Sequence, residues 1–311
     1  MRNDMTDPME QPHDIITYQP SQSPASGQQG VFRLRRMPEV FLEEGFRSVH
    51  LHTHSFYTII WFLQGQGYHY VDFDRYEVVD DTIFFISPGQ MHTFDAQHTQ
   101  LGYVLEFSEE FLQDEHSGES LFLKYDVFNA YDTKPFRIID HATSALLHRM
   151  VKEIERESRN EHLFAHHNCL AMLVCLFLIQ VQRSQQDASG QTSTSSTITS
   201  PQHRTFVKFR QLLERDYRRV HTVSEYARML GVSQKTLTQY TTEAARQTPL
   251  SLINARLTLE AKRLLRFSTM NIKEIGYDLG FEDPSYFNKF FKRQTGLLPG
   301  TFRAEQQQSV R

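Results

Sequence analysis

Closely spaced histidines have the most distinctive chemistry in the N-terminal half of the chain. His50, His52 and His54 occupy alternate positions, so on a β-strand their imidazole rings point to one face. His92 follows a turn signal at residues 87–90 and could join them. Imidazoles can line a small-molecule pocket, hydrogen-bond within a core or bind a divalent metal. We place the pocket first, structural hydrogen bonding second and metal ligation last.

Polar and cationic side chains on two C-terminal segments form a second group with distinctive chemistry. Their amide, hydroxyl and cationic groups are of the kinds that contact base edges and phosphates. A solvated helix face would explain either set alone, but two sets of the same character favour DNA binding. The candidate DNA-contacting residues are Lys235, Thr238, Gln239 and Thr242 in the first segment, Ser285, Asn288, Lys289, Lys292 and Arg293 in the second, and Arg256 between them as a candidate phosphate contact.

An internal repeat would position these two sets. Residues 223–233 and 272–281 align at an offset of 49, and each copy has apolar residues at helical spacing. Each copy stops at a glycine, Gly231 or Gly280, which can adopt the left-handed backbone that ends a helix. A second helix is predicted after each turn. Both copies therefore predict helix-turn-helix units, whose second helix enters a DNA major groove.

One continuous helix is predicted between the repeats, from Pro249 to Arg266. At 1.5 Å per residue this helix is about 27 Å long. It could hold the two recognition helices about one turn of DNA, roughly 34 Å, apart. Its apolar side is predicted to comprise Leu250, Ile253, Leu257, Ala261, Leu264 and Leu265.

Charge is divided unequally along the chain. From residue 203 onward there are 19 Lys and Arg against 10 Asp and Glu, a balance of +9, whereas the preceding part has 14 against 27, or −13. A basic helical domain is expected of a nucleic-acid binder.

Cys169 and Cys175 lie on one apolar helical run and cannot readily form a disulfide with each other. The most apolar run, residues 170–179, is too short to span a bilayer. We expect a cytoplasmic protein with reduced cysteines, no membrane partner and no cofactor.

The C-terminal part of the chain also carries a longer motif. It comprises Arg256-Leu257, Glu260-Ala261, Leu264-Leu265, Ile272–Gly276, Leu279–Phe281, Ser285–Phe287, Phe291–Gly296, Pro299 and Phe302-Arg303. This motif resembles the AraC/XylS family of bacterial transcription regulators. The first repeat departs from the family pattern, because Arg246 replaces a usual glycine and Thr241-Thr242 replace a common Phe-Lys. The resemblance implies double-stranded promoter DNA and RNA polymerase as partners, with activation the commoner outcome.

Short segments of high β-content, separated by turn signals, occupy residues 31–107. They predict an antiparallel sandwich or barrel. The His52/His54 pair and the later His92 resemble the two motifs of a cupin barrel. In metal-binding cupins a carboxylate usually stands four residues after the second histidine of the pair, and here that residue is Thr58.

The resemblance to the effector domain of AraC-type regulators implies a small organic effector bound in the barrel. An aromatic acid is one candidate class and a sugar is the competing one. The alternative function is a cupin metalloenzyme, such as a dioxygenase, with an appended helical domain. No Ser-His-Asp arrangement, phosphate-binding loop or paired-cysteine motif is apparent, so we expect no catalytic residues and no metal. The candidate effector-binding residues are His52, His54, Tyr57, Trp61, Tyr68, His92 and Phe94.

The predicted architecture is α+β with two domains. A disordered tail at residues 1–28 precedes a cupin-like antiparallel β-barrel with two closing helices at 29–182. A flexible linker at 183–202 leads to an all-α DNA-binding domain at 203–311 with two helix-turn-helix units. The second closing helix is apolar on most sides, so it packs on its own barrel or pairs with a second copy in a homodimer. The candidate dimer residues are Leu170, Leu173, Phe177 and Val181.

Overall fold

The chain divides into two compact units, one of residues 15–193 and one built mainly from residues 194–311. We call them the N-terminal and C-terminal units. The computed structural model describes residues 16–18, 30–37, 51–94, 101–112, 126–128, 134–189 and 201–308. None of the helices in these ranges is both long enough and apolar enough to cross a membrane.

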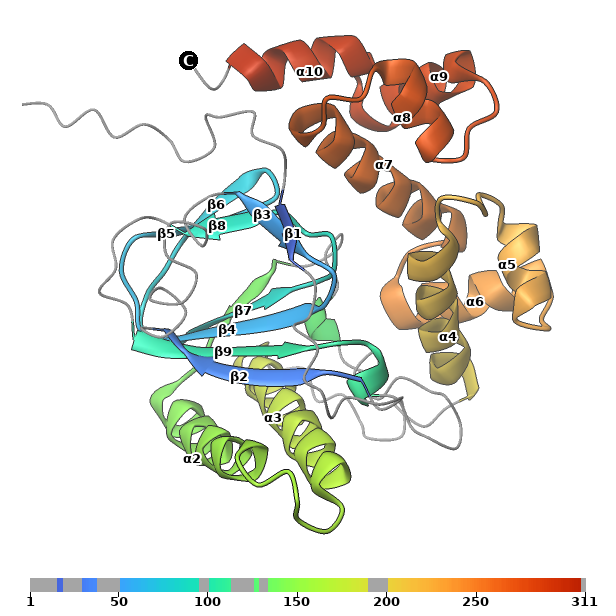
Figure 1. Cartoon of the computed structure of the whole chain (residues 1–311). Coiled ribbons are helices and arrows are strands. Elements are labelled where there is room, and N and C mark those ends of the chain that lie inside the picture. Colours follow the sequence, from blue (N-terminus) through green and yellow to red (C-terminus); the bar gives the residue numbers. More distant parts are fainter. Residues whose placement is uncertain are drawn as a thin grey trace, which may run out of the picture. The chain divides into compact units, whose positions relative to one another are not determined.

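Two five-stranded sheets form the N-terminal unit (Figure 1). The first contains, in spatial order, β1 (Ile16–Tyr18), β3 (His52–His54), β8 (His92–Phe94), β5 (Tyr68–Val71) and β6 (Asp74–Glu77). The second contains β10 (Phe136–Ile138), β7 (Thr82–Ile86), β4 (Tyr57–Gln64), β9 (Leu101–Phe107) and β2 (Phe32–Arg36). All neighbours pair antiparallel except β1 and β3, which are parallel. The cupin-like fold is confirmed, but in the described residues the ladders form two sheets and do not close into one cylinder.

Side-chain alternation along β4 separates two apolar layers. Ile60 and Phe62 join residues of both sheets in the core between them, including Phe84 and Phe94. Trp61 points to the opposite face, because successive residues of a strand alternate. The space between the sheets, which we call the chamber, is therefore lined by one set of alternate residues, and the other set supports the helices.

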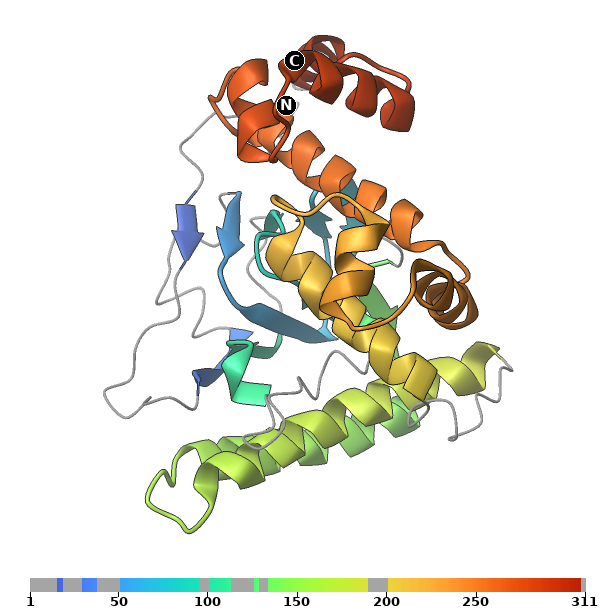
Figure 2. The ribbon, with the colours of Figure 1, turned by 90° about the vertical axis from the view of Figure 1, so that its right-hand side faces the viewer.

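Helices α2 (His141–Ser158) and α3 (His166–Ser189) form a hairpin over the outer face of the second sheet (Figures 1 and 2). The side chain of Asp140 caps α2 by accepting a hydrogen bond from the backbone N–H of Thr143. The dimer prediction is wrong for three residues of α3, because Leu170, Phe177 and Val181 are buried within a single chain. Leu173 is half-buried.

Two segments that were predicted to be irregular contain regular structure. Ile16–Tyr18, inside the predicted tail, forms β1; the rest of residues 1–28 lies outside the described residues. Helix α3 continues to Ser189 and α4 begins at Pro201, so both ends of the predicted linker are helical. Residues 190–200 lie outside the described residues.

Seven helices make up the described part of the C-terminal unit. They are α4 (Pro201–Asp216), α5 (Val223–Met229), α6 (Gln234–Ala245), α7 (Pro249–Phe267), α8 (Ile272–Asp278), α9 (Pro284–Thr295) and α10 (Pro299–Gln308). Helices α5 and α6 form the first helix-turn-helix unit, and α8 and α9 form the second. Helix α7 runs between the two helix-turn-helix units (Figures 1 and 2). The all-α domain with two such units is therefore confirmed.

The apolar side of α7 differs in part from the prediction. Ile253, Leu257, Ala261 and Leu265 are buried as expected. Leu250, in the first turn, is 50% exposed, and Leu252 is buried in its place. Leu264 is only partly buried. The predicted apolar stripe of α7 is therefore wrong at its N-terminal end. Hydrophobic spacing is a weak guide there, because Pro249 begins the helix.

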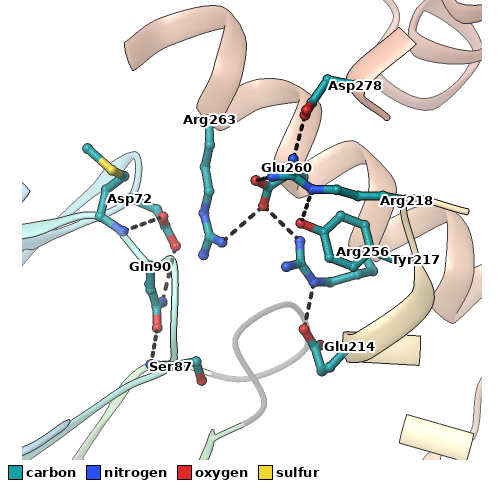
Figure 3. A network of polar contacts seen from close by, with 11 residues as sticks. Asp72, Ser87, Gln90, Glu214, Tyr217, Arg218, Arg256, Glu260, Arg263 and Asp278 are labelled. Carbon is teal, nitrogen blue, oxygen red and sulfur yellow. Dashed lines mark hydrogen bonds and ion pairs between the residues drawn. The ribbon is translucent and has the colours of Figure 1, made fainter. Parts of the chain in front are cut away.

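A network of ion pairs connects α7 to the elements around it (Figure 3). Arg218, after α4, donates to Glu260 of α7 at 2.9 Å and to Asp278 of α8 at 2.6 Å. Arg256 of α7 donates to Glu214 of α4 at 2.8 Å and to Glu260 at 3.0 Å. Burial alone would raise the pKa of Glu260, but the surrounding arginine charges lower it below its usual value. Glu260 therefore carries a negative charge inside the unit.

The turns of the two helix-turn-helix units differ in how tightly they are enclosed. Gly231 and Gly280 both have left-handed backbones, with φ of 66° and 80°. A Cβ atom at Gly231 would meet nothing within 4 Å, whereas one at Gly280 would lie 1.9 Å from the carbonyl oxygen of Arg218. Backbone conformation restricts the first position, and a close backbone approach also restricts the second.

These two glycines provide a matched pair of substitutions. We expect Gly231→Ala to lower the free energy of unfolding by about 1–2 kcal/mol, the cost of a left-handed alanine. Gly280→Ala should cost more than about 4 kcal/mol, because the carbonyl of Arg218 must also move. Denaturant unfolding of the full chain, followed by far-UV circular dichroism, measures both. Equal losses would contradict the close packing at Gly280.

Candidate functional sites

Helix α9 presents a basic outer face in the C-terminal unit. The side chain of Asp283 caps the helix by accepting from the backbone N–H of Ser285, and Pro284 begins its first turn. The inner face is apolar, with Phe287, Phe290 and Phe291 buried. The predicted DNA-contacting residues Ser285, Lys289, Lys292 and Arg293 are exposed on the helix, and Asn288 is partly buried with no hydrogen-bond partner for its Oδ1 among the described residues.

Helix α6 presents a face of different character. Lys235, Gln239 and Thr242 are exposed, and Thr238 is partly buried. Gln239 Nε2 donates to Glu243 Oε1 at 2.8 Å, so this amide is engaged within its own helix. The hydroxyl of Thr242 donates to the backbone carbonyl of Thr238 at 2.8 Å. Lys235 and Glu243 balance each other, whereas α9 carries three positive charges and no negative one.

The end of α6 shows how the first unit accommodates its departures from the family pattern. Arg246 adopts a left-handed backbone with φ of 55°, where the equivalent residue after α9 is Gly296 with φ of 81°. An arginine in this conformation is strained and a glycine is not. Thr241 is buried, and its hydroxyl donates to the backbone carbonyl of Leu237 at 3.0 Å. Helices α6 and α9 therefore end at equivalent positions. The left-handed backbone at the end of α6 costs more free energy, because it is adopted by an arginine and not by a glycine.

Arg256 does not face solvent as a phosphate contact would. Its side chain is buried, paired with Glu214 and Glu260, and its guanidinium lies 3.8 Å from the ring centroid of Tyr217 (Figure 3). The prediction that Arg256 contacts phosphate is therefore wrong. Arg256 is buried on α7, where Glu260 one turn later neutralises its charge inside the C-terminal unit.

In the N-terminal unit, the predicted histidines converge on the chamber. The ring centroids of His52, His54 and His92 are 4.3–4.9 Å apart. One nitrogen from each ring can be chosen such that the three atoms lie within 4.8 Å of one another. All three side chains are buried. His50 lies outside the described residues.

A fourth imidazole, which was not predicted, completes this cluster. His69 is fully buried on β5, and its Nε2 lies 3.1 Å from Nδ1 of His92, a hydrogen-bonding distance. Its ring stacks on Phe94 at 4.6 Å between centroids. The alternation Tyr68-His69-Tyr70-Val71 could have identified it, because the buried Val71 shares its face.

Burial sets the protonation of these histidines. Desolvation, with the positive charge of His52, lowers the pKa of His69 to about 3. Desolvation also lowers the pKa values of His54 and His92 well below their usual value, and neighbouring histidines reinforce it. These imidazoles are therefore neutral at neutral pH, with one nitrogen of each ring able to accept a hydrogen bond or bind a metal.

A side-chain hydrogen bond fixes the turn that precedes His92. Gln90 Nε2 donates to Asp72 Oδ2 at 3.1 Å, and Gln90 Oε1 accepts from the backbone N–H of Ser87 at 3.0 Å (Figure 3). The backbone N–H of Met91 donates to Asp72 Oδ1 at 3.3 Å. The β5–β6 turn therefore holds the start of β8, the strand that carries His92.

Three predicted effector-binding residues face away from the chamber. Trp61 lies beneath the helical hairpin, with ring contacts to His148 of α2 and Phe177 of α3. Tyr57 shares this face and stacks on Phe107. The third is Tyr68, on the strand face opposite His69, where the guanidinium of Arg75 covers its ring. These assignments are wrong because aromatic composition does not say which face of a strand a residue occupies, whereas Phe94 does lie in the chamber.

A buried ion pair shares the interior of the N-terminal unit with the histidines. Arg35 of β2 donates to Glu106 of β9 at 2.6 Å, and both side chains are buried. Glu106 occupies the same strand face as Val104, a residue of the chamber core. The charge of Arg35 also contributes to the lowered pKa of His54. Alternation along the polar sequence of β2 was the available signal for this pair, and sequence reasoning missed it.

Comparison with known proteins gives matches to both units. A model of the AraC-like ligand binding domain matches residues 41–168, and a helix-turn-helix domain model matches residues 226–305. The HTH-type transcriptional activator RhaR of Escherichia coli strain K12 is 23% identical over 283 residues, covering 90% of this chain and 93% of RhaR. RhaR of Cronobacter sakazakii is 23% identical over 255 residues, covering 82% and 86%.

Among solved structures, the match to ToxT from Vibrio cholerae covers 88% of this chain and 98% of the ToxT chain, with 16% sequence identity and a TM-score of 0.37. The family models and the RhaR matches agree with the geometry of both units. The chain therefore belongs to the AraC/XylS family, as a DNA-binding transcription regulator with an N-terminal ligand-binding domain and no enzymatic role.

Proposed function

We propose that the chain is a cytoplasmic transcription activator whose DNA affinity resides mainly in the second helix-turn-helix unit. The single observation that carries this proposal is the contrast between the recognition helices. Helix α9 exposes Lys289, Lys292 and Arg293, whereas on α6 Lys235 is offset by Glu243. Cationic side chains supply most of the affinity for the phosphate backbone. RhaR of Escherichia coli and of Cronobacter sakazakii is named as a transcriptional activator, which supports activation and RNA polymerase as a partner for this chain.

Single substitutions on the two recognition helices test this division. We expect Lys289→Ala to weaken binding by about 1–3 kcal/mol if the lysine meets a base, or to reduce the salt slope by about 1 if it meets a phosphate. Lys235→Ala should have the smaller effect. Fluorescence anisotropy over a range of salt, with DNA selected in vitro by the full chain, measures both. Arg256→Met is the structural control and should lower thermal stability without changing the salt slope.

An effect of Lys235→Ala as large as that of Lys289→Ala would contradict the assignment of affinity to α9. An altered salt slope for Arg256→Met, with unchanged stability, would place that residue at the DNA instead.

For the effector, we propose an organic anion, with aromatic acids as the preferred class. Arg35 supplies a cationic donor, the neutral imidazoles of the histidine cluster each supply one N–H, and Phe94 and Phe62 supply apolar surface near them. An arginine charge bordered by aromatic rings suits a carboxylate on an aromatic ring better than an uncharged sugar.

A thermal-shift series distinguishes these ligand classes. Benzoates should raise the melting temperature of the full chain, because a ligand that binds the native state stabilises it by roughly 3 kcal/mol at a hundred-fold excess over Kd. Matched benzamides and sugars should not. The double variant Arg35→Met with Glu106→Met removes both charges and leaves neither unpaired, so it should abolish the shift. Equal shifts with sugars would contradict the proposal.

We further propose a homodimer formed through the exposed side of α3. Met172 is 70% exposed and Leu176 is 43% exposed, and Leu163 and Phe164 add exposed apolar surface in the connection between α2 and α3. Exposed apolar surface of this kind is typical of protein interfaces. These residues support pairing, in place of the buried residues of the same helix.

Sedimentation velocity of the full chain tests this pairing. Leu176→Glu places a charge in the proposed interface and should shift the protein from dimer to monomer at micromolar concentration. Leu250→Glu, a matched change at an exposed leucine outside α3, should leave the dimer intact. A dimer that persists in Leu176→Glu, or a wild-type monomer, would exclude this interface.

A further inference from the structure

We propose that Arg218 is a positioning residue for DNA binding, which fixes the orientation of the second helix-turn-helix unit relative to the first. Arg218 lies in the connection between α4 and α5, residues 217–222, immediately before the first helix-turn-helix unit. This connection contacts the end of α8 and the turn after it, residues 278–281, in the second. We call these two segments together the clasp. The inference goes beyond the division of affinity between α6 and α9, because it concerns the geometry in which both helices are held.

The first contact of the clasp is an ion pair. Arg218 Nη1 donates to Asp278 Oδ2 at 2.6 Å. On the same guanidinium, Nη2 donates to Glu260 Oε1 of α7 at 2.9 Å, and Nε donates to the hydroxyl of Tyr217 at 2.9 Å (Figure 3). Hydrogen bonds between ionised groups are shorter and stronger than those between neutral groups. One guanidinium therefore joins the connection after α4, the central helix and the end of α8.

The second contact of the clasp is a close approach of two backbones. A Cβ atom at Gly280 would collide with the carbonyl oxygen of Arg218, so only a glycine lets the two segments lie this close. The ring of His221 lies against that of Phe281, with 5.0 Å between the centroids. Burial lowers the pKa of His221, and the backbone carbonyl of Leu279 partly opposes this shift. Charge, backbone and aromatic surface thus hold the same two segments together.

The clasp supplies a connection that α7 alone does not provide. Each helix-turn-helix unit joins α7 through a short segment, residues 246–248 or 268–271. A few residues at the ends of helices can act as hinges, because they absorb large changes of backbone angle. A contact between the two units away from α7 closes this path into a loop and restricts such rotations. Helix α9 is therefore held in one orientation relative to α6, and the two helices can enter grooves at one separation only.

Arg256 provides a matched control for Arg218. Both arginines donate to Glu260, so replacing either one by methionine removes a positive charge from the same network. Within the described residues, the other partners of Arg256 are Glu214 and the ring of Tyr217, which lie outside the second helix-turn-helix unit. Both variants should therefore lose stability, and only Arg218→Met should lose the fixed orientation.

Distances between spin labels test the clasp in the full chain without DNA. The two native cysteines are first replaced by serine. Ala244→Cys on α6 and Gln294→Cys on α9 then place labels at exposed positions outside the proposed DNA contacts. Pulsed electron paramagnetic resonance should give a narrow distance distribution for this protein and for its Arg256→Met variant. Arg218→Met and Asp278→Asn should each widen the distribution about twofold, because the hinges beside α7 are then free to rotate.

DNA of altered spacing gives the functional readout. In DNA selected in vitro by the full chain, two base pairs inserted between the contacted segments rotate one segment by about 70° relative to the other. Wild-type protein should bind the inserted DNA about 10-fold more weakly than the selected DNA, an effect comparable to a mismatched base pair. For Arg218→Met this penalty should fall to about 2-fold, because a freed unit can follow the rotated groove. Arg256→Met should keep the penalty.

The ratio of the two affinities separates positioning from stability, because a purely structural role would leave this ratio unchanged. An unchanged label distribution in Arg218→Met, or a spacing penalty that this variant keeps in full, would overturn the proposal. Equal binding of both DNA spacings by the wild type would also overturn it, and would leave the assignment of affinity to α9 intact. Circular dichroism verifies that each variant is folded. If Arg218→Met does not fold, Asp278→Asn provides both measurements, with the same expected and contradicting results.

Discussion

A carboxylate buried on α7 holds the DNA-binding unit together. Removing a charge from water costs several kcal/mol unless partners neutralise it and satisfy its hydrogen bonds. Glu260 has these partners in Arg218 and Arg256, with Arg263 at 3.6 Å. Because Arg218 also pairs with Asp278 of α8, the charge connects the central helix to the second helix-turn-helix unit. The position of α9 therefore depends on electrostatic pairing as well as on apolar packing.

The N-terminal unit depends on a different constraint, the strict alternation of side chains along its strands. In β4, Ile60 and Phe62 enter the chamber while Trp61 supports the α2–α3 hairpin. The same rule brings His52 and His54 inward on β3 and His69 inward on β5. Four imidazoles thus share one interior, with Arg35 and Glu106 as a neutralised pair beside them. Polar chemistry is concentrated in the chamber, and the outer face of the second sheet is aromatic.

Much of the architecture was predictable from local signals. The two glycine turns, their capping residues and the apolar spacing predicted both helix-turn-helix units, because these features act within a few residues of chain. The motif of α7 to α10 also carried the family resemblance. The sheet class followed from turn signals and β-content. These features need no knowledge of which distant segments meet.

The site residues were harder to predict, because their positions depend on which segments distant in the sequence contact one another. Arg256 was expected to contact phosphate, but inside the unit it pairs with Glu260 and with the half-exposed Glu214, which stands 42 positions earlier. Trp61 was assigned to the pocket from its composition, and only the pairing of β4 with its neighbours shows which face it occupies. His69 and Arg35 were missed for the same reason. Helix-face predictions were more reliable on α9, where the buried phenylalanines leave no ambiguity about the opposite side.

The placement of β3 has a consequence for how the chamber responds to an occupant. This strand lies between β1 and β8, with partners on both sides, so its backbone is fixed by two ladders. Side chains on a strand held in this way are preorganised, and little conformational entropy remains to be lost when something binds to them. Binding at His52 and His54 can therefore proceed with little loss of backbone entropy, and the adjustment is confined to rotations of the rings.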